Sequence, residues 1–106
     1  FSYLAKKAHD HGSRIYGATI MPCGNTEYSE KWMQAFEKTR RDVNQWIRTQ
    51  SVYDGYFDFD DILKNDTVPA YLKEEVHIGD GLHPNTMGGK ILAECVDLSM
   101  LTGLDD

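Results

Sequence analysis

Short apolar segments alternate with longer amphipathic ones along the chain, and this alternation predicts its secondary structure. Residues 14–20 (RIYGATI) are mostly apolar, which is typical of a strand buried in a parallel sheet, and residues 56–60 (YFDFD) alternate as a second strand does. Apolar side chains recur at helical spacing over 30–48 and over 86–101, so we expect two amphipathic helices there. A further helix is expected over residues 2–11.

Local signals mark the ends of these helices and the faces that they bury. Gly12 is placed to stop the first helix, and Ser29 is placed to cap the helix over 30–48. The expected buried stripe of the 30–48 helix consists of Trp32, Met33, Phe36, Val43, Trp46 and Ile47, and the charged residues expected on its other side include Lys38, Arg40, Arg41 and Asp42. The stripe expected on the last helix consists of Met87, Ile91, Leu92, Cys95, Val96 and Leu98.

The order helix, strand, helix, strand, loop, helix favours an α/β layered fold with parallel strands. Residues 61–78 are expected to be mostly irregular, with a helical turn near 70–75. Two buried strands make a poor sheet by themselves, so we expect further parallel strands beside them. Since the chain begins at Phe1 rather than at Met, we also expect it to be processed or truncated.

The composition argues against two kinds of partner. With 106 residues, the chain is near the usual size of one domain. Its net charge of −6 and pI near 5.1 argue against a nucleic-acid surface, because phosphate binding needs a basic stripe. No apolar run approaches the ~20 residues of a membrane span. The spacing of Cys23 and Cys95 fits no zinc or redox motif, and Cys95 is expected to be a buried free thiol on the last helix.

The candidate chemistry lies in a glycine-flanked loop, residues 79–85 (GDGLHPN), just before the last helix. Asp80 stands three residues before His83, a spacing that can pair a general base with the carboxylate that orients it. The two glycines permit backbone angles that other residues resist, and Pro84 pushes His83 away from helical angles.

The start of the last helix carries its own signals. Asn85 or Thr86 is placed to cap it. Gly88 and Gly89 each cost about 1 kcal/mol relative to alanine inside a helix. We therefore expect close packing of this first turn to offset that cost.

Several segments resemble those of the SGNH hydrolases, the GDSL-type esterases and lipases. Residues 80–84 (DGLHP) resemble the last sequence block of that family, in which an Asp and a His stand three residues apart. Three earlier segments resemble the family in the same order. Residues 17–22 resemble a "GATxxP" strand and loop, and residues 57–60 resemble a later strand. Between them, an "R-x-x-x-N-x-W-I-R" helix is resembled by Arg41, Asn44 and residues 46–48. Gly88 or Gly89 with Ala93 fits the closing helix.

This resemblance implies that residues 1–106 are the C-terminal part of a single SGNH hydrolase domain. The fold would be part of a three-layer α/β/α sandwich with a parallel sheet, the flavodoxin-like fold of the family, incomplete in this chain. His83 would be the general base and Asp80 its orienting partner. The reaction would be hydrolysis of a small acyl or acetyl ester through an acyl-serine intermediate, without a metal or another cofactor.

The nucleophile and oxyanion donors of the family have no counterpart in the sequence. The family's serine lies in an N-terminal Gly-Asp-Ser block, and a glycine and an asparagine from middle blocks complete its oxyanion hole. None of the five serines has that context: Ser2, Ser13, Ser29, Ser51 and Ser99. We therefore expect the chain to be inactive alone.

Two other interpretations remain open. His77, Asp80 and His83 recur at three-residue intervals and are zinc-capable residue types, so they could form a metal site. The chain could instead be a non-catalytic half-domain that binds a partner or associates with itself through the open edge of an incomplete sheet.

Asp58 and Asp60, near the end of the second strand, are expected in solvated or capping roles.

Overall fold

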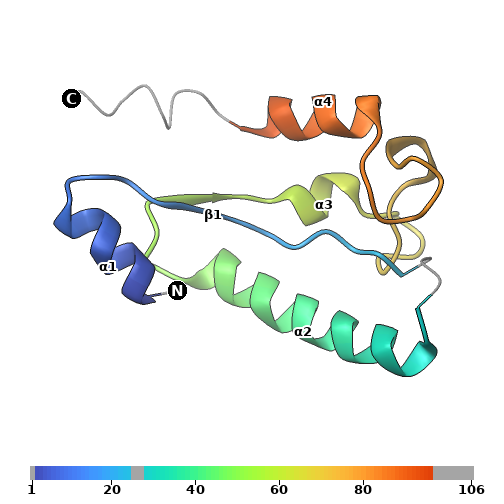
Figure 1. The fold of residues 1–106 in the computed structure, drawn as a ribbon, viewed down its shortest axis with the longest axis horizontal. Coiled ribbons are helices and arrows are strands. Elements are labelled where there is room, and N and C mark those ends of the chain that lie inside the picture. The colour runs from blue at the N-terminus through green and yellow to red at the C-terminus, as the bar shows by residue number, and fades with distance from the viewer. Residues whose placement is uncertain (1, 25–27, 97–106) are drawn as a thin grey trace.

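The computed structural model describes residues 2–24 and 28–96, and a pair of parallel strands lies at its centre (Figure 1). β1 (Tyr16–Ala18) and β2 (Gly55–Phe57) pair in register, with Tyr16 opposite Gly55 and Ala18 opposite Phe57. The predicted mixed α/β class and parallel pairing are therefore confirmed, although β1 is shorter than the apolar run over 14–20. The helices are α1 (Ser2–Asp10), α2 (Glu30–Thr49), α3 (Phe59–Leu63), the 3₁₀ helix η1 (Glu74–Val76) and α4 (Thr86–Cys95).

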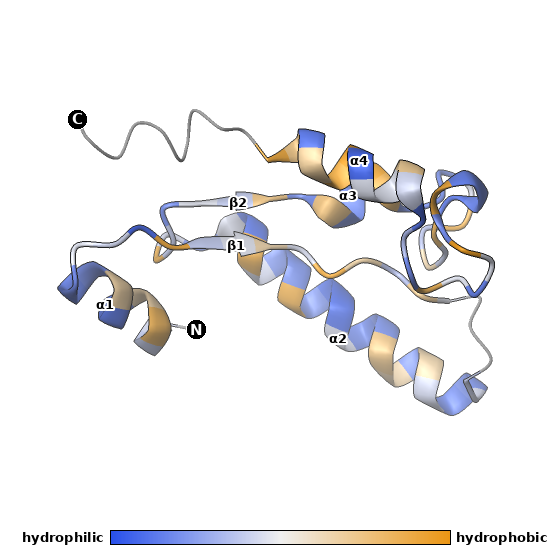
Figure 2. Ribbon diagram, turned by 45° about the horizontal axis from the view of Figure 1, so that its top comes forward, coloured by the Kyte–Doolittle hydropathy of each residue, from blue (hydrophilic) through white to orange (hydrophobic). Residues whose placement is uncertain are grey.

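Helices lie on both sides of the strand pair. α2 runs along one side of β1 and β2, and α4 runs along the other (Figure 1). α4 packs against α3 and η1, and its Ile91 and Leu92 cover a small core of Leu63, Leu72 and Val76, each 0% exposed. Figure 2 shows hydrophobic residues on α4 and along the chain that follows β1.

The second strand is shorter than the alternation over 56–60 predicts. β2 ends at Phe57, and the following residues turn into α3, whose N-cap is Asp58. The Asp58 carboxylate accepts a hydrogen bond from the Asp61 N–H (3.2 Å), which satisfies a free backbone donor at the start of the helix. The strand prediction is therefore wrong at 58–60, whereas the expected capping role of Asp58 is confirmed. The helical turn expected near 70–75 is η1, slightly later in the chain.

α2 buries Ile47 of the predicted stripe, which is 6% exposed, but its buried face also includes two polar residues that were not predicted there. Arg40 is only 3% exposed and Asn44 only 1%, whereas Trp32 is 44% exposed. A 20-residue helix is about 30 Å long and a three-residue strand about 10 Å, so only part of α2 can cover the sheet. Trp32 lies in the N-terminal half of α2, in ring contact with Tyr28 and Phe36. The predictions of a solvent-facing Arg40 and a core Trp32 are therefore wrong.

The ends of α1 and α4 differ in how well they were predicted. Gly12 follows α1 with a φ of +76°, which confirms its role as the helix stop. Met87, at the start of α4, is 54% exposed rather than buried. Cys95 is a free thiol, as predicted, but is only half-buried. Residues 97–101 of the predicted last helix, including Leu98, lie outside the described residues.

The Asn44 side chain takes the place of a strand neighbour just after β1. Its Oδ1 accepts a hydrogen bond from the Ile20 N–H (2.7 Å), and its Nδ2 donates to the Ile20 carbonyl (2.9 Å). One buried side chain therefore satisfies both backbone groups of a residue beyond the end of the ladder. This contact fixes α2 against the chain that leaves β1.

The two glycines at the start of α4 differ in packing. We therefore expect their alanine variants to change the free energy of unfolding in opposite directions. A Cβ at Gly88 would fall on the Val76 carbonyl oxygen, whereas a Cβ at Gly89 would meet nothing within 4 Å. The expected close packing is thus confirmed at Gly88 only. We expect Gly88→Ala to lower the free energy of unfolding by about 1–3 kcal/mol through overpacking. Gly89→Ala should raise it by about 0.5–1 kcal/mol through helix propensity. Urea denaturation measures both, and changes of the same sign would contradict this packing.

Candidate functional site

The loop between η1 and α4 is closed at its base by Asn85. The Asn85 N–H donates to the Val76 carbonyl (2.8 Å). Its side-chain Oδ1 accepts from the Gly88 N–H (2.9 Å) and so caps α4, and its Nδ2 donates to the Glu75 carbonyl (2.9 Å). The predicted capping by Asn85 is confirmed, and the same residue ties the start of α4 to the chain that enters the loop.

Asp80 and His83 are in direct contact inside this loop. Gly79 and Gly81, on either side of Asp80, have φ values of +109° and +70°, in the region that other residues resist. Oδ1 of Asp80 accepts the N–H groups of Leu82 and His83, each at 2.9 Å. Oδ2 lies 2.5 Å from Nδ1 of His83. The carboxylate is therefore held by the backbone on one oxygen and meets the imidazole with the other.

This contact determines where the protons lie. An ionised carboxylate can only accept, so Nδ1 of His83 carries the shared hydrogen, and in the neutral ring Nε2 has a free lone pair. The hydrogen bond from the His83 ring, followed by those from the His83 and Leu82 N–H groups, holds the pKa of Asp80 below its ordinary value of 3.8. The His83 side chain is 66% exposed, and within the described ranges its Nε2 has no hydrogen-bond partner. An oriented imidazole with an open Nε2 is what a general base requires.

No serine hydrogen-bonds to this pair in the part of the chain that the structure describes. Ser29 caps α2 by accepting the Trp32 N–H (3.2 Å), and none of the described serines hydrogen-bonds to His83. Ser99 lies outside the described residues. The buried Cys23 offers no substitute, because burial and then the negative charge of Glu37 raise the pKa of its thiol.

His77 does not join Asp80 and His83 in a metal site. Its Nδ1 accepts hydrogen bonds from the Gly79 N–H (3.0 Å) and the Gly81 N–H (3.2 Å), so that nitrogen is occupied. Among residues 2–24 and 28–96, no three His, Cys, Asp or Glu side chains converge as metal ligands do. His77, Asp80 and His83 are therefore not arranged as metal ligands in the described part of the chain.

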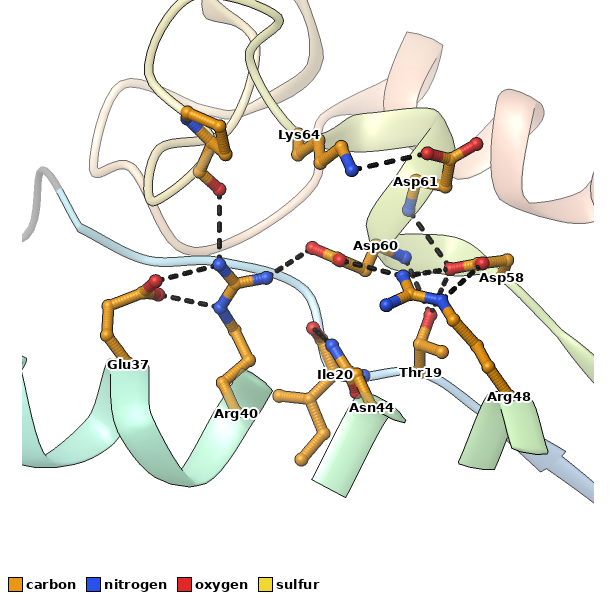
Figure 3. Close-up of polar contacts among 11 residues, drawn as sticks. Thr19, Ile20, Glu37, Arg40, Asn44, Arg48, Asp58, Asp60, Asp61 and Lys64 are labelled. Atoms are coloured by element: carbon orange, nitrogen blue, oxygen red, sulfur yellow. Dashed lines mark hydrogen bonds and ion pairs between the residues drawn. The ribbon is translucent and has the colours of Figure 1, made fainter. Parts of the chain in front are cut away.

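A second polar cluster lies between α2 and α3, and it includes Arg40 (Figure 3). The Arg40 side chain is 4% exposed and forms ion pairs with Asp60, which is 5% exposed, and with Glu37 (2.6 Å). The guanidinium also donates to the Pro69 carbonyl (3.2 Å). Burial opposes the charge, but the hydrogen bond to Glu37 and then the negative charge of Asp60 outweigh it and raise the pKa of Arg40 above its ordinary value. Arg40 is therefore a buried, fully charged group rather than part of a solvated face.

The cluster extends to the ends of both strands. Arg48 donates two hydrogen bonds of 2.7 Å to Asp58 and one of 3.0 Å to Asp60. Thr19, just after β1, donates its hydroxyl to Asp58 (2.9 Å) and accepts the Asp60 N–H (2.9 Å). The Arg48 hydrogen bonds hold the pKa of Asp58 below its ordinary value of 3.8 despite partial burial. The cluster thus joins α2 to the chain that follows each strand (Figure 3).

The first arginine of the R-x-x-x-N pattern is Arg40, and the assignment of Arg41 to it is wrong. Three residues separate Arg40 from Asn44, and Arg41 is exposed. Arg40, Asn44 and Arg48 recur every four residues, which places them on one helix face. This spacing was the signal in the sequence that could have identified the buried polar face.

Comparison with protein-family models finds no match to the chain, and comparison with curated proteins finds none either. In the described ranges, no helix is both long enough and apolar enough to cross a bilayer.

Proposed function

We propose that residues 1–106 are the C-terminal part of an SGNH-type serine esterase or lipase, a GDSL-type acylhydrolase. His83 is the general base, Asp80 orients it, and the nucleophilic serine and oxyanion donors belong to a preceding part of the same domain. The serine oxygen attacks the carbonyl carbon of a small acyl or acetyl ester while Nε2 of His83 takes its proton. That proton passes to the alcohol oxygen as the ester C–O bond breaks, which leaves an acyl-serine and a neutral imidazole. Nε2 then takes a proton from the water that attacks the acyl-serine and returns it to the serine oxygen as the acid departs.

The 2.5 Å contact between Asp80 Oδ2 and His83 Nδ1 carries this proposal. In an ordinary surface ion pair, both side chains are free to rotate, and the contact stabilises the protein little. Here two backbone N–H groups hold the other carboxylate oxygen, so the direction of the imidazole is set. The His83 side chain is 66% exposed, so a substrate and a nucleophile can reach the remaining ring nitrogen.

The shape of the chain supports an incomplete domain. Its radius of gyration is 15.5 Å, whereas a self-contained domain of this length would have about 13 Å. Two strands pair in the described residues, fewer than an independently stable sheet needs. Large apolar side chains are exposed on β2, just after β1, in the loop and on α4, among them Ile20, Tyr56, Ile78, Leu82 and Met87. In the proposed domain, the remaining strands of a three-layer α/β/α sandwich cover part of this surface.

A fluorophosphonate probe, which tags activated serines, tests where the nucleophile lies. We expect the chain alone to keep its mass of 12.1 kDa, because none of its described serines contacts His83. We expect the complete protein to gain one adduct, on a serine that precedes these residues, and to lose hydrolysis of short acyl esters. An adduct on a serine of this chain would refute the proposed position of the nucleophile. A complete protein that neither binds the probe nor hydrolyses esters would refute the function.

A further inference from the structure

His77 is a buried histidine that the proposed reaction leaves without a role. Its side chain is 5% exposed. Its Nδ1 accepts the Gly79 N–H at 3.0 Å and the Gly81 N–H at 3.2 Å. These glycines lie on either side of Asp80, so one ring nitrogen holds the backbone before and after the carboxylate proposed to orient His83.

The hydrogen bonds assign His77 a single tautomer. A nitrogen that accepts two N–H groups carries no hydrogen, so Nδ1 is bare and Nε2 is protonated. Within the described residues Nε2 has no hydrogen-bond partner, and the Glu74 carboxylate is 4.0 Å away. His83 has the opposite tautomer, because its Nδ1 faces the carboxylate of Asp80. The loop therefore contains two imidazoles whose protons are arranged in opposite ways.

We propose that His77 is a positioning residue for the Asp80–His83 pair, a role that rests on the function proposed above. Gly79 and Gly81 have φ values of +109° and +70°, and glycines can reach many other conformations. The two hydrogen bonds to His77 Nδ1 favour the observed conformation over the others. With the backbone held, Asp80 directs Oδ2 at the His83 ring. Loss of the Nδ1 acceptor frees the segment and lets Asp80 turn away from His83.

Two substitutions separate the Nδ1 acceptor from the rest of the side chain. In His77→Asn, Oδ1 takes the place of Nδ1 and can accept the N–H two residues later, as asparagine does in turns. In His77→Gln, the carboxamide reaches the place of Nε2 and leaves the place of Nδ1 empty. Neither side chain is charged, so the two variants differ chiefly in where the acceptor lies.

NMR spectra of the full chain test this role. In the parent, the ring ¹⁵N shifts should show a bare Nδ1 in His77 and a protonated Nδ1 in His83. In H77Q we expect the Gly79 and Gly81 amides to exchange with solvent about tenfold faster. The His83 ring should also shift toward the tautomer protonated at Nε2. In H77N both readouts should keep the parental values. Unchanged amide shifts in α2 confirm that each variant is folded.

Three results would overturn the assignment: a His77 ring protonated at Nδ1, equal amide exchange in the parent and H77Q, or an H77N variant that behaves as H77Q does. The NMR spectra need no substrate. A complete protein that does not hydrolyse esters would therefore refute the proposed function, whereas the spectra would still show whether His77 Nδ1 holds the Gly79–Gly81 backbone. In an active complete protein, H77Q should lower kcat with little change in KM, and H77N should restore kcat. A positioning residue acts through His83 and does not touch the substrate.

Discussion

Replacement of His83 by glutamine is expected to lower kcat for ester hydrolysis by the complete protein about 10⁴–10⁶-fold. Glutamine reaches the position of Nε2 but cannot take the proton of the serine, so acyl transfer loses its general base. KM should change little, because the ring handles the reacting proton rather than binding the body of the substrate. Steady-state kinetics with a chromogenic short-chain ester measures both constants.

Two further variants are compared with His83→Gln. His11→Gln is the matched control, because the exposed His11 ring bonds to the Lys7 carbonyl (2.9 Å) on the surface of α1. Its kcat should equal that of the parent. Asp80→Asn should cost about 10³–10⁴-fold, since an amide can donate to Nδ1 and favour the wrong tautomer of His83. An H83Q protein with more than about a tenth of the parental kcat would contradict the assignment of the base.

Replacement of Arg40 by methionine is expected to lower the free energy of unfolding by about 3–5 kcal/mol. The side chains of Arg40 and Asp60 are 4% and 5% exposed, so the substitution leaves a buried carboxylate whose remaining ion pair is with Arg48 at 3.0 Å. Glu37 loses its partner as well. Methionine retains an unbranched apolar stem, so the loss reports the charge and its hydrogen bonds more than a cavity. Urea denaturation followed by circular dichroism measures it.

Lys38→Met on the same helix is the control for Arg40→Met. Lys38 pairs with Asp42, but these side chains are 76% and 64% exposed. A solvated pair four residues apart contributes about 0.3–0.5 kcal/mol, so this variant should unfold almost as the parent does. If both variants lost the same stability, the buried cluster would be no stronger than a surface ion pair.

Features set by neighbouring residues could be predicted from the sequence. The helix expected over 30–48 is α2 (Glu30–Thr49), and its expected cap, Ser29, accepts the Trp32 N–H. The Asp80–His83 contact was predictable for the same reason, because its partners and the two glycines lie within one short loop. Spacing and turn chemistry are sufficient where each partner is a few positions away.

Features that depend on distant partners could not be predicted in this way. Asp58 alternates with aromatic residues as in a strand, yet its carboxylate starts a helix and bonds to Thr19, 39 positions earlier. Arg40 can be buried because its guanidinium forms an ion pair with Asp60, 20 positions later in the chain. A charged residue is ordinarily assigned to the surface unless its partner is known. Hydropathy along the chain therefore placed Arg40 in solvent and Trp32 in the core.

The parallel pairing of β1 with β2 has a consequence for the order of folding. All of α2 lies between the two strands, so contacts such as Thr19–Asp58 span 39 positions and can form only after the crossover has closed. Closing such a segment lowers the chain entropy before any stabilising contact forms. Long-range pairing is therefore slow. The Asp80–His83 contact spans three positions and needs no such closure. The chain can therefore acquire the geometry of a proton acceptor early in folding, and it joins its longest helix to the sheet late.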